Sequence, residues 1–184
     1  MNIDWQPSGL IDGNVRLEPL REEHFEELYA VASDPLVWAQ HPNPDRYRRE
    51  VFRTFFDGAM ASGGAFLIRA VDDGRAIGSS RFYEHDPEAG EVKVGYTFFA
   101  RECWGRGVNP TVKRLMLAYA FRHVERVVFH VGAANIRSQK AMEAIGAVKV
   151  GEVDVAYHGE SVKKNFVYEI RGGSFREGPL SAEP

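Results

Sequence analysis

The chain has 184 residues, of which 44% are hydrophobic and 27% charged, so its composition predicts a folded globular protein and excludes a disordered one. Its formal net charge of -3 gives no electrostatic reason to expect binding to nucleic acid or to an anionic membrane. The single cysteine, Cys103, excludes an internal disulfide, and the six histidines show no metal-ligand spacing, so we expect no metal.

Neither end of the chain suggests export or membrane insertion. The N-terminus lacks the basic start and the apolar run of a signal peptide. No segment approaches the ~20 apolar residues that a membrane span needs. We therefore expect a cytoplasmic protein.

The first half of the chain predicts a strand, two helices and three further strands. Residues 15–19 alternate in polarity like a strand, and helical spacing follows over 22–33. The proline-containing segment 38–47 is predicted to be a loop, and a second helix begins near Val51 and ends at Gly63. Strand patterns follow, with turns between them, and predict an antiparallel meander over 65–71, 75–84 and 91–100.

The second half alternates helices with strands. We predict helices over 110–123 and 135–145, with a β-branched strand over 126–131 between them. Two last strands, 148–157 and 163–170, flank a turn at His158–Gly159. The absence of a linker or repeat predicts one domain over 1–184, with a core at about 15–170 and a mobile tail at 171–184.

The most informative segment runs from a strand through a glycine-containing loop into a helix. Asn109 suits the N-cap of this helix and Pro110 its first position. The loop amides and the first helix amides would then converge on one point, which favours a bound phosphate. Gly105 and Gly107 would let the backbone approach that anion closely, although two glycines can also simply turn the chain.

Two motifs, one in this segment and one about thirty residues later, give the chain a family resemblance. Residues 104–109, Trp-Gly-Arg-Gly-Val-Asn, resemble the W-G-x-G-x-x pyrophosphate loop of the RimJ/RimL-like (ribosomal-protein N-acetyltransferase) branch of the GNAT superfamily. Residues 135–141 resemble its N-x-x-S-x-x-A signature, followed by Ile-Gly-Ala at 145–147. The resemblance implies an α/β (α+β) GNAT fold, a mixed, mostly antiparallel twisted sheet of about seven strands flanked by about four helices.

The resemblance also implies acetyl-CoA as co-substrate and a set of contacts with it. The backbone that would hold the pyrophosphate belongs to Trp104, Gly105, Arg106, Gly107, Val108 and Asn109. The backbone that would pair with the pantetheine arm belongs to Phe98, Phe99 and Ala100. Asn135 would contact the cofactor backbone and Lys140 a phosphate, but Asn135 also suits a helix N-cap and Lys140 a solvated surface.

Acetyl transfer needs a neutral amine and a proton for the departing thiolate, and an amine with a pKa near ~10.4 is mostly charged at neutral pH. Ser138 matches the serine placed near the thioester sulfur in the family, so we predict that it donates the proton. The position at which the branch usually carries a glutamate is Lys93. Glu91 on the same strand face, and Glu84 and His85 at the end of the neighbouring strand, could each act as base through a water, and Glu91 is our predicted base.

The acceptor site is less well marked by the sequence. Glu84 and His85 end the neighbouring strand, and Trp38 lies in the proline-rich loop that forms the acceptor wall in GNAT proteins. We therefore predict that these three residues contact the acceptor. Each also has a simpler reading, as a solvated surface group or as a surface anchor.

Three functions are compatible with these patterns. The first is an acetyl-CoA-dependent N-acetyltransferase acting by direct attack of a primary amine, either a protein N-terminal α-amine or a small molecule. The second is a non-catalytic GNAT-fold module that binds CoA as a sensor or partner. The third is a phosphate-binding module unrelated to CoA. A homodimer is expected only by analogy with GNAT relatives.

Overall fold

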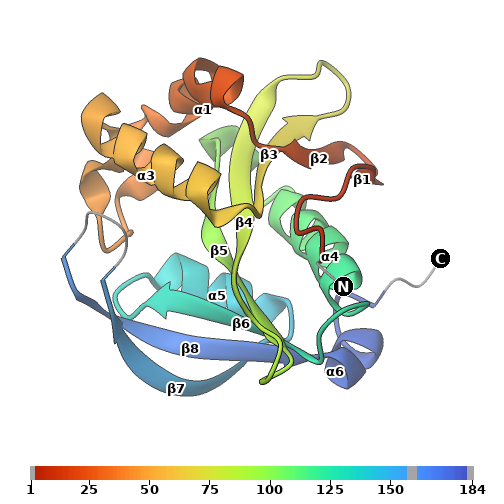
Figure 1. The fold of residues 1–184 in the computed structure, drawn as a ribbon. Helices are drawn as coiled ribbons and strands as arrows, with labels where there is room; N and C mark the ends of the chain where they lie inside the picture. The colour runs from red at the N-terminus through yellow and green to blue at the C-terminus, as the bar shows by residue number, and fades with distance from the viewer. Residues whose placement is uncertain (1–2, 157–160, 182–184) are drawn as a thin grey trace.

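The computed structural model describes residues 3–156 and 161–181, which fold around one open sheet of eight strands (Figure 1). The spatial order of the strands is β1-β2-β3-β4-β5-β6-β8-β7, and every neighbouring pair is antiparallel except β5 and β6. The strands are β1 (Leu10–Asp12), β2 (Val15–Pro19), β3 (Ala65–Ala70), β4 (Ala76–Asp86), β5 (Glu91–Phe99), β6 (Arg126–Gly132), β7 (Val148–Val155) and β8 (Lys163–Arg171).

Helices cover both faces of this sheet. Within the described residues they are α1 (Phe25–Ala32), α2 (Pro35–Trp38), α3 (Arg49–Ser62), α4 (Val108–Ala120), α5 (Ile136–Ala144) and α6 (Gly172–Glu177). None of these described helices is long and apolar enough to cross a membrane. The mixed, mostly antiparallel architecture is therefore confirmed, with one strand and two helices more than predicted.

The strands and α-helices that the sequence did not predict are three short ones, β1, α2 and α6. β1 has three residues, too few for a periodic pattern to show. α2 ends at Trp38, the first residue of the predicted loop. It starts at Pro35, and the Asp34 carboxylate accepts a hydrogen bond from the N–H of Leu36. α6 lies in the predicted tail, where Leu180 is also buried. The predicted turn at His158–Gly159 lies outside the described residues.

The start of α4 corrects one detail of the loop. The helix begins at Val108, with Gly107 as its N-cap at φ 79°, and not at Pro110 after an Asn109 cap. Only glycine adopts this backbone conformation without strain, which allows the helix to begin two residues earlier. Asn109 is therefore inside the first turn, and its side chain is free to face the pocket described below.

The two faces of the sheet carry separate apolar cores, because side chains alternate along each strand. On β3, Phe66 and Ile68 pack towards α4, whereas Leu67 packs towards α1 and α3. Figure 1 shows α1 and α3 together on one side of the sheet and α4 on the other. β5 contributes to both cores, with Phe98 in one and Phe99 in the other, and the candidate site lies along this strand.

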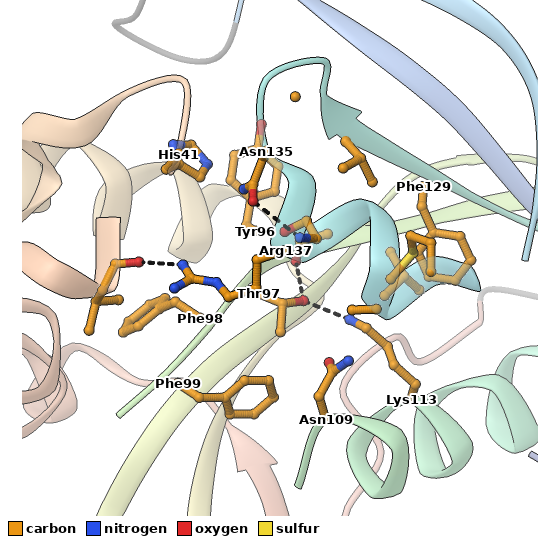
Figure 2. A pocket seen from close by; sticks show the side chains of 18 of the residues that line it. His41, Tyr96, Thr97, Phe98, Phe99, Asn109, Lys113, Phe129, Asn135 and Arg137 are labelled. Carbon is orange, nitrogen blue, oxygen red and sulfur yellow. Dashed lines mark hydrogen bonds between the residues drawn. The ribbon is translucent and has the colours of Figure 1, made fainter. Parts of the chain in front are cut away.

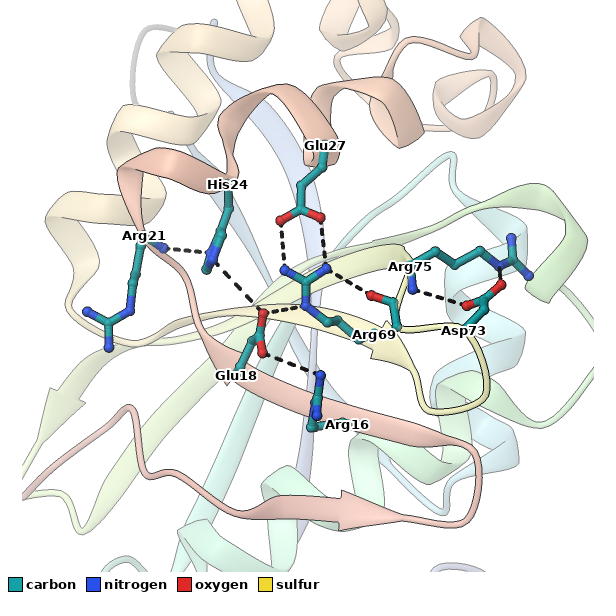
Figure 3. Close-up of polar contacts among 9 residues, drawn as sticks. Arg16, Glu18, Arg21, His24, Glu27, Arg69, Asp73 and Arg75 are labelled. Carbon is teal, nitrogen blue, oxygen red and sulfur yellow. Dashed lines mark hydrogen bonds and ion pairs between the residues drawn. The ribbon is translucent and has the colours of Figure 1, made fainter.

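A partly buried arginine joins β2, β3 and α1 (Figure 3). Arg69 of β3 donates two hydrogen bonds to the Glu27 carboxylate, at 2.8 and 2.7 Å, and another to Glu18 of β2. The bidentate geometry holds the planar guanidinium between two carboxylates. Arg69 in turn lowers the pKa of Glu27, chiefly through these hydrogen bonds.

Replacing this arginine should destabilise the fold. We expect Arg69→Met to lower the free energy of unfolding by about 2 kcal/mol, because Glu27 loses its bidentate partner and Glu18 keeps only its longer contacts with Arg16 and His24. The lowered pKa of Glu27 means that its contribution is present above the unfolded carboxylate pKa and is lost as pH falls, so the difference should shrink below about pH 4. Denaturant unfolding at several pH values measures both effects.

Arg75→Met is the matched control. Arg75 also contacts two carboxylates, those of Asp73 and Glu102, but half of its side chain is exposed. Its loss should change stability by no more than about 0.5 kcal/mol. Equal effects of the two substitutions would contradict a special role for Arg69.

Candidate active site

The site lies where β5 and β6 separate. These parallel strands pair only over three residues, Glu91↔Arg126, Val92↔Val127 and Lys93↔Val128. β5 continues to Phe99 and β6 to Gly132, but in the described register the paired residues of this stretch, Val94, Gly95, Phe98 and Phe99, have their partners in β4. The N–H and C=O groups on the other edge of β5 are therefore open to a ligand that pairs like a strand.

A bulge in β5 sets which side chains face each side of this split. Tyr96 has φ 54°, and the β4–β5 register shifts between Ser79 and Arg81. The extra residue reverses the alternation, so that Thr97 faces α4 while Tyr96 packs with the ring of Phe55 at 5.9 Å on the α3 side. Without the bulge, Thr97 would face the other way.

The loop before α4 is shaped to receive an anion. Gly105 and Gly107 have φ values of 70° and 79°, which bend the chain back towards the split. The first amides of α4 have no partner inside the helix and lie at the positive end of its dipole. The side chain of Asn109 lies in the same pocket (Figure 2). This loop and helix start can therefore hold a phosphate or pyrophosphate group.

The start of α5 forms the opposite wall. The Asn135 carboxamide caps the helix by accepting the N–H of Ser138 at 3.1 Å. Arg137 stacks its guanidinium 4.0 Å above the Trp104 ring and donates to the Val37 carbonyl at 2.9 Å (Figure 2). Arg137 thus joins the anion-binding loop, α5 and α2 around the mouth of the pocket.

A buried lysine lies beneath the split. Lys113 of α4 is 2% exposed, and its Nζ donates to Thr97 Oγ1 at 2.7 Å (Figure 2). A longer bond, 3.4 Å, reaches the Ser80 hydroxyl of β4. Burial lowers the pKa of Lys113 to about 7, so its charged and neutral forms are both populated near neutral pH.

The α3 side of the split has a different chemical character. Trp38 is buried, donates its Nε1–H to the Ala32 carbonyl at 2.8 Å and lies beside Phe98. Burial and the adjacent Arg46 hold the pKa of His41 well below its ordinary value. Burial and the positive charge of Lys93 also lower the pKa of His130 on β6. Both histidines are therefore neutral at pH 7.

These walls enclose a cavity of about 470 Å³. Its described lining holds the cations Arg46 and Arg137, Lys113, which is partly charged near neutral pH, and the two neutral histidines, and none of the described lining residues is an aspartate or glutamate. Anionic groups are favoured in such a cavity, and polycations are disfavoured.

The structure brings many of the predicted site residues to this cavity. Its lining includes Trp38, Phe98, Phe99, Trp104, Gly105, Gly107, Val108, Asn109, Asn135 and Ser138. Ala100 is buried behind it, whereas Arg106 and Lys140 are exposed outside it.

The three predicted acid–base or acceptor residues at the far ends of β4 and β5 are not among the residues that line the cavity. Glu91 pairs with Arg126, and Glu84 with Lys93. The His85 ring packs on Trp5, with ring centres 5.1 Å apart. Each therefore has a structural partner outside the cavity lining, although the Glu84 and Glu91 charges still act on the pKa of His130, which they raise against the larger lowering by burial and Lys93.

Sequence reasoning missed Lys113 and His130. Lys113 lies in the apolar stripe of α4, beside Val112, Met116 and Leu117, and a lysine in such a stripe was an available signal. His130 lies between two core residues of β6, Phe129 and Val131, so alternation places it on the opposite face. Its proximity to the split depends on strand pairing, which the sequence does not reveal.

Comparison with known proteins identifies the family. Residues 14–148, more than half of the chain, match the acetyltransferase (GNAT) domain. The chain belongs to the GNAT acetyltransferases. None of the curated proteins matches the sequence.

Solved structures show the same fold. A protein from T. thermophilus assigned as an acetyltransferase is 26% identical over 95% of this chain and 94% of its own, with a TM-score of 0.77. A GCN5-related N-acetyltransferase from Brucella melitensis is 21% identical over 93% and 80% of the two chains, with a TM-score of 0.75. Mycobacterium smegmatis RimJ in complex with CoA-disulfide is 16% identical over 91% and 87%, with a TM-score of 0.69.

The anion-binding loop can be tested through its backbone. We expect Gly107→Ala to weaken acetyl-CoA binding by roughly tenfold, because a side chain at φ 79° costs about 1 kcal/mol or more and shifts the first amides of α4. Calorimetric titration measures the affinity. Gly151→Ala in β7 is the control, since its φ is not positive and a Cβ there meets no atom within 4 Å. Unchanged affinity in Gly107→Ala would contradict the assigned loop.

Proposed function

We propose that this GNAT acetyltransferase moves the acetyl group of acetyl-CoA to a primary amine, by direct attack of the amine on the thioester. The split between β5 and β6 carries the proposal, because it connects an open strand edge to the phosphate-binding start of α4. The edge of residues 94–99 fits the amide groups of a pantetheine arm, and the loop at 101–107 fits a pyrophosphate. The bound cofactor would supply an activated thioester.

The protein's own groups orient the reactants and stabilise charge. Free backbone N–H groups on the β5 edge, near Phe98 and Phe99, would donate to the oxygen on which negative charge develops. The rings of Trp38 and Phe98 exclude water from the α3 side of the split. A dry site strengthens those hydrogen bonds and disfavours the charged form of the acceptor amine.

We assign the base role to His130 in place of Glu91. Glu91 is held by Arg126 and does not line the cavity. His130 does line it, and its lowered pKa leaves a lone pair available at neutral pH. A neutral imidazole on the α3 side can take a proton from an incoming ammonium, directly or through one water.

The charges of the cavity favour one class of acceptor. The described lining has three cations and none of its residues is a carboxylate, so a polyamine would meet repulsion. We propose an acceptor whose reactive amine stands beside neutral or acidic groups, such as an amino acid or the N-terminus of a protein with acidic neighbours. An acid-rich peptide should therefore be acetylated faster than spermidine.

Binding and turnover test this function in two steps. Acetyl-CoA at a hundred times its dissociation constant should stabilise the fold by ~2.7 kcal/mol, and ATP or free pyrophosphate should not. Release of CoA thiol is then followed over a panel of amines that includes free amino acids, acidic peptides and spermidine. No melting shift would refute cofactor binding. A shift without turnover on any amine would favour the non-catalytic CoA-binding module.

The base assignment predicts a defined pH profile. Because the pKa of His130 is lowered, its neutral form persists to below the ordinary histidine range, and on the acid side of the profile kcat/KM should fall only when pH drops through that lowered pKa. The His130→Gln variant should lack this fall of kcat/KM at low pH, and its kcat should be lower by about 10²-fold. His123→Gln is the control, since His123 packs on Tyr119 away from the cavity. A His130→Gln profile that matches the wild type would refute the assignment.

A further inference from the structure

Lys113 is the feature of the cavity that the proposed reaction leaves unexplained. It reaches the split from α4, and its Nζ contacts Thr97 of β5 and lies 6.0 Å from the Phe129 ring of β6. Thr97 follows the bulge, and Phe129 is the first β6 residue after pairing with β5 ends. The amine is therefore centred beneath the point at which the two strands separate (Figure 2).

This placement is costly for the folded protein. Among the described residues the hydrogen-bond partners of Nζ are two hydroxyls, Thr97 and Ser80, and none is a carboxylate. Burial of a lysine without an opposite charge disfavours its charged form and lowers stability. The two hydroxyls are also 2.8 Å from each other, so they would remain hydrogen-bonded without the lysine. The packing of the fold thus does not require an amine at this position.

The position also separates Lys113 from the phosphate end of the site. Lys113 lies four residues after Asn109, on the same side of α4, about 6 Å further from the start of the helix. A pyrophosphate held by the first amides of α4 lies at the helix start. The groups of the cofactor that follow along the open edge of β5 are the pantetheine arm and then the sulfur.

We propose that Lys113 contacts the sulfur of the bound cofactor and donates the proton that the leaving thiolate takes up. This inference rests on the function proposed above. The acceptor nitrogen forms a bond to the acetyl carbon, the carbon–sulfur bond breaks, and its electron pair goes to sulfur. The Lys113 ammonium then passes one proton to sulfur, which leaves CoA thiol and a neutral amine. The proton lost by the acetylated nitrogen goes to His130 or water, and solvent recharges Lys113.

The chemistry of Lys113 suits this step. Its pKa of about 7 is set by burial, and the groups that face Nζ are the hydroxyls of Ser80 and Thr97 and the ring of Phe129, none of which titrates near neutral pH. A thiolate is the counter-charge that the amine lacks, so formation of the thiolate and protonation of Lys113 stabilise each other. Thr97 holds the amine in position by accepting a hydrogen bond from it.

Ser138 was the proton donor predicted from sequence, and it lines the same cavity from α5. The two assignments separate experimentally, because a lysine contributes a charge as well as a proton. A cationic donor stabilises a thiolate in the resting complex with CoA, whereas a hydroxyl does so only weakly. Binding of CoA compared with desulfo-CoA, which lacks the sulfur, isolates this contribution.

The experiment compares the wild type with Lys113→Met, Ser138→Ala and Lys164→Met by calorimetric titration with CoA and with desulfo-CoA. We expect the wild type to bind CoA at least about tenfold more tightly than desulfo-CoA. Lys113→Met should bind both ligands within about twofold of each other, with desulfo-CoA affinity unchanged, and its kcat should fall by about 10²-fold. Lys164→Met, an exposed lysine of β8, should behave as wild type.

The outcomes distinguish this inference from the function on which it rests. If the wild type binds neither ligand, the proposed function fails and this inference fails with it. If the wild type binds CoA and turns over, but Lys113→Met keeps the tenfold preference for CoA, only the role of Lys113 is overturned. If Ser138→Ala is the one variant that loses the preference for CoA over desulfo-CoA, the contact with the sulfur belongs to Ser138. Acetylation of Lys113 itself, detected by mass spectrometry at a rate equal to turnover, would also overturn the proton-donor role.

Stability provides an independent check that Lys113→Met folds. A lysine whose pKa is lowered on folding binds fewer protons in the folded than in the unfolded state between pH 7 and its ordinary pKa, so wild-type stability should rise with pH in that window. Lys113→Met should lack this rise and should melt higher than wild type at about pH 6, with the difference shrinking towards about pH 10. A lower melting temperature at both pH values would show that Lys113 serves the fold.

Discussion

The interrupted pairing between β5 and β6 is the constraint on which the rest of the site depends. Three residue pairs hold the strands together, and beyond them β5 continues along the cavity with β4 as its paired strand. An edge of this kind can accept a ligand that pairs like a strand. The bulge at Tyr96 sets the direction of the side chains along the same edge, and it alone places Thr97 towards α4.

The split also divides the proton chemistry between two faces of one sheet. Alternation along β6 sends Phe129 towards α4 and His130 towards the α3 side, and the bulge does the same for Thr97 and Tyr96. The sheet therefore separates a lysine from a histidine, and the pKa of each is lowered mainly by burial. Each of the two groups, with such a pKa, can gain or lose a proton near neutral pH, and the described cavity lining has no carboxylate.

The helices at the mouth of the cavity depend on contacts between distant parts of the chain. Arg137 binds the Val37 carbonyl and stacks on Trp104, so the loop before α4, the start of α5 and α2 are held in one arrangement. Trp38 adds a buried hydrogen bond to Ala32 within the α1–α2 unit. Arg69 performs the corresponding role further away, where it joins α1 to β2 and β3. Packing and hydrogen bonds from distant parts of the chain thus converge around the site.

Local patterns in the sequence by themselves determined most elements, because turns, caps and periodicity act over a few residues. Asn135 caps α5 as its position suggested, and the glycines at 105 and 107 adopt the conformations that a phosphate loop needs. Only the tertiary structure decided which groups meet at the split. Glu91 shares a strand face with the expected base position, yet strand pairing places it against Arg126. Lys113 and His130 reach the cavity through a helix and a strand far apart in the chain, and their pKa values follow from burial that no local pattern encodes.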